Sequence, residues 1–377
     1  MSGSQSSNDD LVEELLDFCQ SESLSEDGLR DIIERYDYDW NNIHVDRNYE
    51  FFLEACRNER VTAGILRCLL EYFPDAINST DEEGFRERHG MTPLHIICFN
   101  RFATRGMVQL IVDASPESLS RVDNDGWMPL HTLCNKKELE DNAASDILGL
   151  LLERCPEAVR RVENKYGAPP IHVACGVGSK SFEFCRMLIE AYPGSERIGD
   201  PLPCPPFHLV CRHNTVATAE YLYKLYPECI NLTDIYGAYP IHYAIEGLAF
   251  RTDPATAIAM VQFLLASNPN VASQRRDDFM LLPLTWVFEK VDANDSSEPK
   301  LSAAKEILQM LYDVHPEAIE EEADLCDLPE EIRTFINAQL VYARQARDLR
   351  QMNMMRVDNY HSIERFVTMS PLVQSSS

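Results

Sequence analysis

The sequence is short of positive charge. Lys and Arg number 34 against 61 Asp and Glu, which gives a formal net charge of −27 over 377 residues. A surface this acidic repels phosphate backbones and anionic lipid headgroups. We therefore expect neither nucleic acid nor a membrane surface as a partner.

Long apolar runs and export signals are also lacking. No run of about 18 apolar residues could span a bilayer. The opening residues, MSGSQSSNDDLVEELLDF, have neither the basic start nor the apolar stretch of a signal peptide. We therefore expect a cytoplasmic or nuclear protein, in which the twelve cysteines are reduced thiols and do not form a disulfide framework.

A short motif recurs along the chain. MTPLHIIC at 91–98 returns as MPLHTLC at 128–134, PPIHVAC at 169–175, PPFHLVC at 205–211, YPIHYAI at 239–245 and LPLTWVF at 282–288. The motif histidines, separated by 36, 41, 36 and 34 residues, are His95, His131, His172, His208 and His242. A period of about 33–45 residues is typical of stacked solenoids.

A second feature recurs with the same period. In each unit a proline lies four residues after an apolar pair, and we call these positions the proline register. The prolines of this register are Pro74, Pro116, Pro156, Pro193, Pro227, Pro269 and Pro316. Each apolar pair lies in a segment such as AGILRCLLEYF, whose apolar residues recur at i, i+3 and i+4, as on the buried face of a helix. Proline then ends that helix.

A polar stretch separates each proline from the next motif. In it, Asp or Asn stands three residues before glycine, as in Asp123 to Gly126, Asn164 to Gly167 and Asp234 to Gly237. Asx side chains close turns on their own backbone, and glycine supplies a positive φ. Each unit is therefore predicted to contain a short helix, a second helix ended by proline, and a projecting turn.

These residues resemble the ankyrin-repeat family, whose repeats carry Asp-x-x-Gly-x-Thr-Pro-Leu-His at the turn and the start of the first helix. The resemblance covers about residues 49–320, in seven units that begin with a weaker one at EFFLEAC (50–56). It departs from the family in two ways. The threonine of the motif is present only at Thr92, and Pro-Glu-Ala or a similar segment follows the second helix. The alternative is another helical solenoid without projecting turns.

The resemblance implies an all-α fold, an α-solenoid of about seven helix-turn-helix repeats with helical caps at both ends. The motif histidines would bond backbone groups at the turns, and the turn glycines would be Gly90, Gly126, Gly167 and Gly237. We divide the chain into a disordered tail (1–10), capping helices (11–48), the array (49–321), a C-terminal helical extension (322–366) and a second disordered tail (367–377). The extension could cap the array or bind a partner, and we favour the cap.

The repeated His-x-x-Cys pairs are His95/Cys98, His131/Cys134, His172/Cys175 and His208/Cys211. Zinc needs about four ligands at roughly 2.0–2.3 Å, whereas helices of adjacent repeats pack about 8–10 Å apart. Disulfides between equivalent cysteines need Cα atoms within about 7 Å. Four identical catalytic pairs would be unusual, so we interpret the pairs as packing residues and expect no metal, no cofactor and no catalytic residue.

The favoured function is a non-enzymatic protein–protein interaction scaffold or adaptor, monomeric, whose protein partner the sequence does not identify. As the resemblance implies, contact would come from the turn tips and from the concave ends of the first helices. The turn-tip positions are His89, Met91, Asp125, Trp127, Tyr166, Leu202, Tyr236 and Phe279. The helix-end positions are Phe99, Asn100, Asn135, Lys136, Arg212, His213, Glu246, Glu289 and Lys290.

Two other functions stay open. One is a substrate adaptor of a ubiquitin ligase, which would dock the ligase through the C-terminal helix, although no box motif supports it. The other is an enzyme using Cys and His. That enzyme would need one cysteine in a cleft with a lowered pKa and a separate oxyanion site.

Overall fold

The computed structural model describes residues 3–36, 49–81, 90–137, 139–164, 167–178, 180–199, 204–276, 281–290, 297–318, 330, 332–339, 341 and 345, with side chains from residue 10 onward. The named elements of this part are sixteen α-helices and short 3₁₀ turns. Sheet-type pairing within it is confined to an isolated bridge between Asp81 and Met91. The predicted all-α fold is confirmed.

The helices form two layers. The odd-numbered layer contains α1 (Gly3–Gln20), α3 (Glu50–Arg57), α5 (Pro93–Phe99), α7 (Pro129–Asn135), α9 (Pro170–Val177), α11 (Pro206–His213), α13 (Pro240–Phe250) and α15 (Pro283–Lys290). The even-numbered layer contains α2 (Glu26–Arg35), α4 (Ala63–Tyr72), α6 (Arg105–Ala114), α8 (Asp141–Arg154), α10 (Phe182–Ala191), α12 (Val216–Leu225), α14 (Pro254–Ser267) and α16 (Glu298–Val314).

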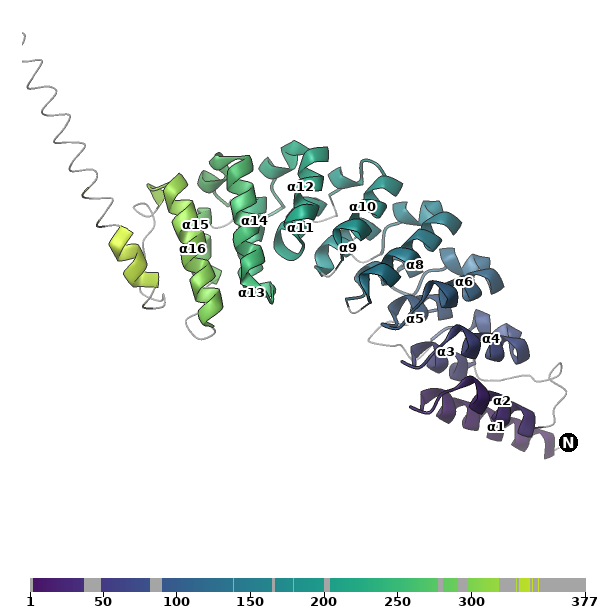
Figure 1. The fold of residues 1–377 in the computed structure, drawn as a ribbon. Helices are drawn as coiled ribbons and strands as arrows, with labels where there is room; N and C mark the ends of the chain where they lie inside the picture. Colours follow the sequence, from purple (N-terminus) through teal and green to yellow (C-terminus); the bar gives the residue numbers. More distant parts are fainter. Residues whose placement is uncertain are drawn as a thin grey trace, which may run out of the picture.

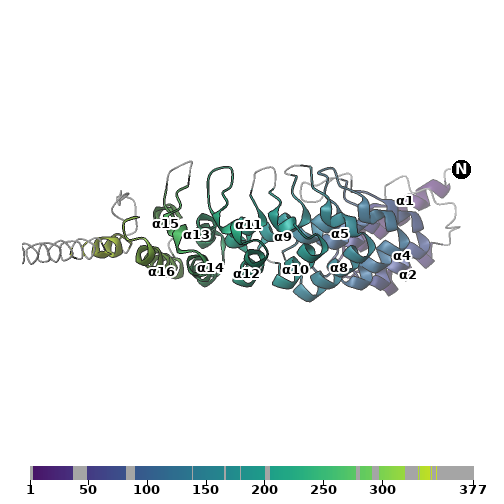
Figure 2. The ribbon, with the colours of Figure 1, turned by 90° about the horizontal axis from the view of Figure 1, so that it is seen from above.

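Each helix packs on the next helix of its own layer, α3 on α5 and α5 on α7, α4 on α6 and α6 on α8. This series is an α-solenoid, and that prediction is confirmed as well. The stack bends into an arch, and the ends at which odd-numbered helices pass into even-numbered ones line its hollow (Figure 1). The turns project from the odd-numbered layer as a row along one edge (Figure 2).

The two layers begin their helices in different ways. From α5 to α13 the odd-numbered helices start with proline, whose fixed φ suits the first helical turn, where its missing N–H is not needed. Several even-numbered helices start at a Ser or Thr N-cap whose hydroxyl accepts a backbone N–H. These caps are Ser25, Thr62, Thr104, Ser181 and Thr215.

The register prolines end the even-numbered helices, as predicted. Ring closure at proline removes the N–H that a continuing helix would need. Five of these prolines start a 3₁₀ turn instead, at Pro74, Pro116, Pro156, Pro227 and Pro269. The Pro-Glu-Ala segments that depart from the family pattern are therefore single 3₁₀ turns that lead the chain back toward the odd-numbered layer.

One hydrophobic core runs along the stack, from Leu11 in α1 to Ile336 beyond α16. The motif cysteines Cys98, Cys134 and Cys175 lie inside it without exposed surface. A free cysteine in such a place behaves as a small hydrophobic residue. The interpretation of these cysteines as packing residues is confirmed.

Both ends of the stack differ in part from expectation. Helix α1 begins at Gly3, within the segment expected to be a disordered tail, because polar residues there continue a helix nucleated by the buried face of Leu11 and Leu15. At the other end the helical residues 332–339 pack on α16, with Ile336 buried and the Gln339 amide bonded to Gln309 at 2.9 Å. Residues 330, 341 and 345 are helical as well, and the other residues of the extension and the tail 367–377 lie outside the described residues.

Candidate interaction surfaces

Two of the projecting turns are closed by an aspartate. One oxygen of Asp234 accepts the backbone N–H groups of Tyr236 and Ala238, both at 2.8 Å, and Gly237 has a φ of 70°. Asp123 accepts two N–H groups of its own turn in the same way, beside Gly126 with a φ of 80°. The predicted Asx–Gly turns are confirmed at these two places.

The turn before α9 is closed differently from the prediction. Glu163, and not Asn164, closes it by accepting the N–H of Ala168 at 3.2 Å. This turn is one residue longer, and the extra methylene of glutamate spans it. Asn164 instead reaches the preceding turn, where its N–H donates to the Asp125 carbonyl at 3.0 Å and its side chain lies against Gly126. Neighbouring turns are therefore bonded to one another.

The motif histidines join one unit to the next. The Nδ1 of His95 accepts the N–H of Thr92 at 3.2 Å, so its Nε2 carries the proton and donates to the Trp127 carbonyl of the next unit at 2.8 Å. The Thr92 hydroxyl lies 2.8 Å from the same Nδ1. His131 repeats both backbone contacts, with its own turn and with the next unit. The expected bonding of the histidines to turn backbone is confirmed at these positions.

Three of these histidines are neutral at pH 7. Burial lowers the pKa of His172, His208 and His242 to about 4, because the imidazolium would lose its hydration among apolar neighbours. Two of them contact turn backbone: the Nε2 of His208 lies 3.1 Å from the Leu232 carbonyl oxygen, and the Nδ1 of His242 accepts the N–H of Tyr239 at 3.1 Å.

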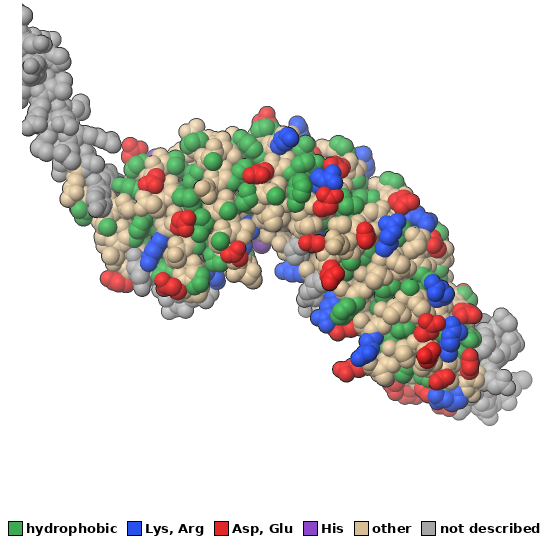
Figure 3. All heavy atoms as spheres, viewed as in Figure 1, with side chains coloured by type: hydrophobic (Ala, Val, Ile, Leu, Met, Phe, Trp, Pro, Cys, Tyr) green, Lys and Arg blue, Asp and Glu red, His purple; other side chains and the backbone are tan. Residues whose placement is uncertain are grey.

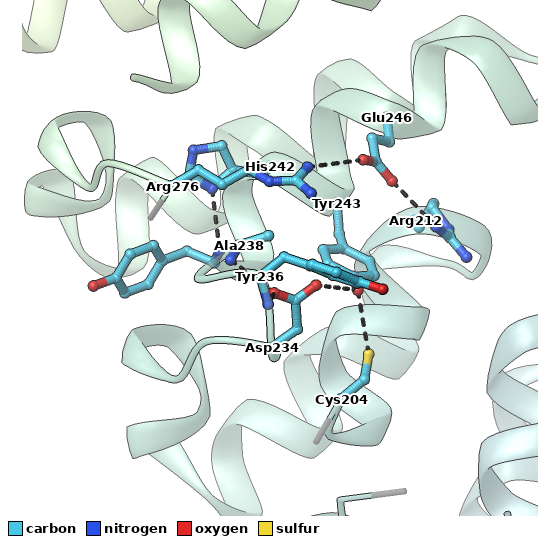
Figure 4. A network of polar contacts seen from close by, with 10 residues as sticks. Cys204, Arg212, Asp234, Tyr236, Ala238, His242, Tyr243, Glu246 and Arg276 are labelled. Carbon is cyan, nitrogen blue, oxygen red and sulfur yellow. Dashed lines mark hydrogen bonds and ion pairs between the residues drawn. The ribbon is translucent and has the colours of Figure 1, made fainter. Parts of the chain in front are cut away.

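A buried network holds the turn beneath Tyr236 (Figure 4). The Tyr243 hydroxyl on α13 donates to the second oxygen of Asp234 at 2.8 Å, and it accepts from the Cys204 thiol at 3.5 Å. The Tyr243 ring packs edge-on against His208, with ring centroids 5.2 Å apart. Burial raises the pKa of Tyr243, so it stays a hydroxyl donor. The turn is thus fixed to two units at once.

The predicted turn-tip residues differ in exposure. Tyr236 is 52% exposed, whereas Trp127 is half-buried with its ring centroid 5.9 Å from that of His131. Met91 was expected at a tip but is only 1% exposed, since its backbone bridges Asp81 and turns the side chain into the core. Asp125 is exposed. The remaining tip predictions, His89, Tyr166, Leu202 and Phe279, lie outside the described residues.

The sequence reading missed exposed aliphatic side chains on the same turns. Val122 and Val162 each precede the residue that closes a turn, and Ile235 precedes Tyr236; all three are exposed. The recurrence of valine at one register, just before an acidic turn residue, was the signal that could have found them. We call Val122, Val162, Ile235 and Tyr236 the turn row.

Among the helix-end predictions, Asn100 has a structural position. It is 7% exposed, and its amide donates to the carbonyls of Cys56, Arg57 and Asn58 in the preceding unit. Those bonds occupy the donors that a partner would need, so the expectation of a contact residue there is corrected. Asn135 is half-buried at the end of α7.

The other helix-end residues pair cations with rings. The Lys136 ammonium lies 4.7 Å from the Phe99 ring centroid, and the Arg212 guanidinium lies 5.1 Å from that of Tyr243. Arg212 also forms an ion pair with Glu246 at 3.1 Å and donates to His213.

The last helix-end predictions lie on α15. Glu289 is exposed, and the Lys290 ammonium lies 4.0 Å from the Trp286 ring centroid. The helix-end positions thus face the hollow of the arch with a mixture of cations and aromatic rings.

The cysteines have the opposite chemistry to that of a nucleophile. Burial raises the pKa of the Cys98 thiol to about 12 and raises the pKa of Cys134 and Cys211 as well. A reactive cysteine needs a lowered pKa and access. In the described ranges no group of three or more His, Cys, Asp or Glu side chains could hold a metal ion.

The arrangement defines a class of fold, the helical-repeat α-solenoid. No family model and no curated protein matches the chain. Among solved structures, this chain is similar to one chain of a structure described as a predatory endopeptidase from Bdellovibrio bacteriovorus in complex with an immunity protein. The identity is 17%, the TM-score is 0.41, and the match covers 56% of this chain and 95% of that chain.

A likeness of this degree transfers no activity and no partner. In the part of the chain with described structure, none of the helices is both long and apolar enough to cross a membrane.

Proposed function

We propose that the chain is a non-enzymatic protein-interaction scaffold of the ankyrin-repeat type, which binds a protein partner through its turn row and through the helix ends around the hollow. The ankyrin assignment is supported by units with two antiparallel helices and a projecting turn, by turn glycines with positive φ, and by histidines that bond turn backbone. The raised thiol pKa values favour a binding function over a Cys/His enzyme.

The observation that carries the proposal is the presentation of Tyr236. Its side chain is more than half exposed, while the backbone beneath it is fixed by Asp234, Gly237 and Tyr243. An exposed aromatic ring lowers solubility, and such a ring on a fixed backbone is a typical anchor of binding interfaces. Because the turn is already ordered, a partner would gain contact area without ordering a loop.

The test is capture of partners by the purified full-length chain, with mass spectrometry, for wild type and Tyr236→Ala. An aromatic anchor contributes about 2 kcal/mol or more to binding. Tyr236→Ala should therefore reduce recovery of the main partner by about thirtyfold or more. Its melting temperature should stay nearly unchanged, because the lost ring is mostly in solvent.

Leu225→Ala is the matched control for a turn-row partner and should capture it normally. It removes another exposed large apolar side chain, at the end of α12 in the even-numbered layer. Trp127→Ala should reduce both capture and stability, because that ring also packs beside His131. Undiminished capture by Tyr236→Ala would place the main contact away from the turn row and refute the proposal in this form.

A further inference from the structure

Cations gather at the hollow although the chain is acidic overall. Four consecutive odd-numbered helices end in a basic residue or lead into one: Lys137 after α7, Lys180 after α9, Arg212 in α11, and Arg251 after α13. In the space-filling view Lys and Arg side chains reach the edge of the hollow below the middle of the arch (Figure 3). We call these four residues, together with Phe250, the hollow site.

The backbone brings these helix ends close together. The end of α9 approaches the end of α11 so closely that a Cβ on Gly178 would lie 2.6 Å from the His213 carbonyl oxygen. The end of α13 packs on α11 in the same way, with the Arg251 guanidinium donating to the Cys211 carbonyl at 3.0 Å. Burial lowers the pKa of the His213 imidazole, and the charges of Arg212, Arg251 and Lys137 lower it further. Lys137 acts from two units away, which shows that curvature brings it within electrostatic reach.

Two cations of the hollow site, Lys180 and Arg251, contact a ring or a carbonyl. Lys180 is 4% exposed, and its ammonium lies 4.8 Å from the Phe184 ring centroid, with no described carboxylate within ion-pair distance. Arg251 is half-buried and bonds a carbonyl. Arg212 is the member with an ion pair, to Glu246. Buried charge without an ionic partner is costly, and a chain with 61 Asp and Glu could have supplied that partner.

An apolar anchor lies among these cations. Phe250 is 61% exposed at the end of α13, 5.2 Å from the Arg212 guanidinium and edge-on to His213. Helix α13 continues to Phe250, so the ring lies at the helix end. An exposed ring between cations suits a ligand that carries both carboxylates and an apolar side chain.

We propose that the hollow site binds an extended acidic peptide segment of a partner protein, and this rests on the proposed scaffold function. The site crosses four units spaced about 10 Å apart, which gives a span of about 30 Å. An extended chain rises about 3.3 Å per residue, so about ten residues would cross it. A row of cations of this length fits a peptide with several carboxylates better than a single small anion.

The test uses a fluorescein-labelled peptide of about ten residues, composed of Glu, Asp and Leu, and measures fluorescence anisotropy with the full-length chain. Lys137→Glu changes the charge of an exposed residue and should weaken binding about tenfold at low salt, with a smaller loss in about 0.3 M salt. Phe250→Ala should also weaken binding by about tenfold.

Lys224→Glu is the matched control, since it makes the same charge change at an exposed position on α12 in the other layer. Equal weakening by Lys224→Glu and Lys137→Glu would show that only net charge matters and would overturn the proposal. Tighter binding of a single-stranded oligonucleotide than of the peptide would overturn it in favour of nucleic acid. Tyr236→Ala should bind the peptide normally, so failure of the hollow site and failure of the turn row are distinguishable.

Discussion

Mildly acidic pH should destabilise the stack through its buried histidines. The pKa of His172, His208 and His242 is about 4 in the fold, against about 6.5 in an unfolded chain. Below pH 6.5 the unfolded chain therefore binds protons that the folded chain does not. The stabilisation is complete above pH 6.5 and is lost as the pH falls toward 4.

The magnitude follows from these values. At about pH 5 each histidine costs the fold about 2 kcal/mol relative to neutral pH, so the three together cost up to about 6 kcal/mol. Exposed glutamates with lowered pKa, such as Glu117 and Glu157, would add their losses below pH 4.5, outside the range between about pH 7 and about pH 5. A loss of about 6 kcal/mol is comparable to the whole stability of many domains.

The assay is urea unfolding followed by far-ultraviolet circular dichroism, at about pH 7 and about pH 5. His208→Gln keeps an N–H that can donate to the Leu232 carbonyl, which His208 contacts at 3.1 Å, but it cannot titrate. Its loss between the two pH values should be smaller than that of wild type by about 2 kcal/mol. His315→Gln, beyond the end of α16, is the control and should follow wild type. The same loss in His208→Gln as in wild type would refute the reasoning.

Two further predictions concern the buried polar network and the core. Tyr243→Phe should lower the free energy of unfolding by about 1–3 kcal/mol because it leaves a buried oxygen of Asp234 without its donor. Tyr221→Phe on α12 is the control and should cost little, since its hydroxyl makes no described hydrogen bond. Equal melting temperatures of the two variants would contradict the network. Cys134→Ala should lower stability by about 1 kcal/mol. Cys134→Asp should lower it by several kcal/mol, because an unpaired carboxylate would be buried there. Similar losses for the two variants in thermal unfolding would contradict the burial of this position.

Helix boundaries depend on residues that are close together in the chain, so the sequence could predict them. Proline at Pro116 and the i, i+3, i+4 pattern of α6 act within a few residues, so the sequence predicts that helix and its end. The repeat period then predicts stacking, because a unit with one apolar face must cover it with the next unit.

Side-chain exposure depended on contacts between units. Met91 and Tyr236 were both assigned to turn tips, yet one is buried and the other exposed. Asn100 was expected to be free for a partner, but its amide reaches carbonyls more than 40 residues away in the chain. No local pattern records such a contact, because the partner atoms come from another unit.

The sequence by itself determined the repeat, its two helices, the turn glycines and the buried place of the motif cysteines, since each follows from backbone preference and apolar period. Only the tertiary structure decided which surfaces are available. Lys137 and Phe250 are more than a hundred residues apart, and the curvature of the stack brings their helix ends to one hollow. That curvature is the sum of small packing rotations between units, which depend on side chains meeting across every interface.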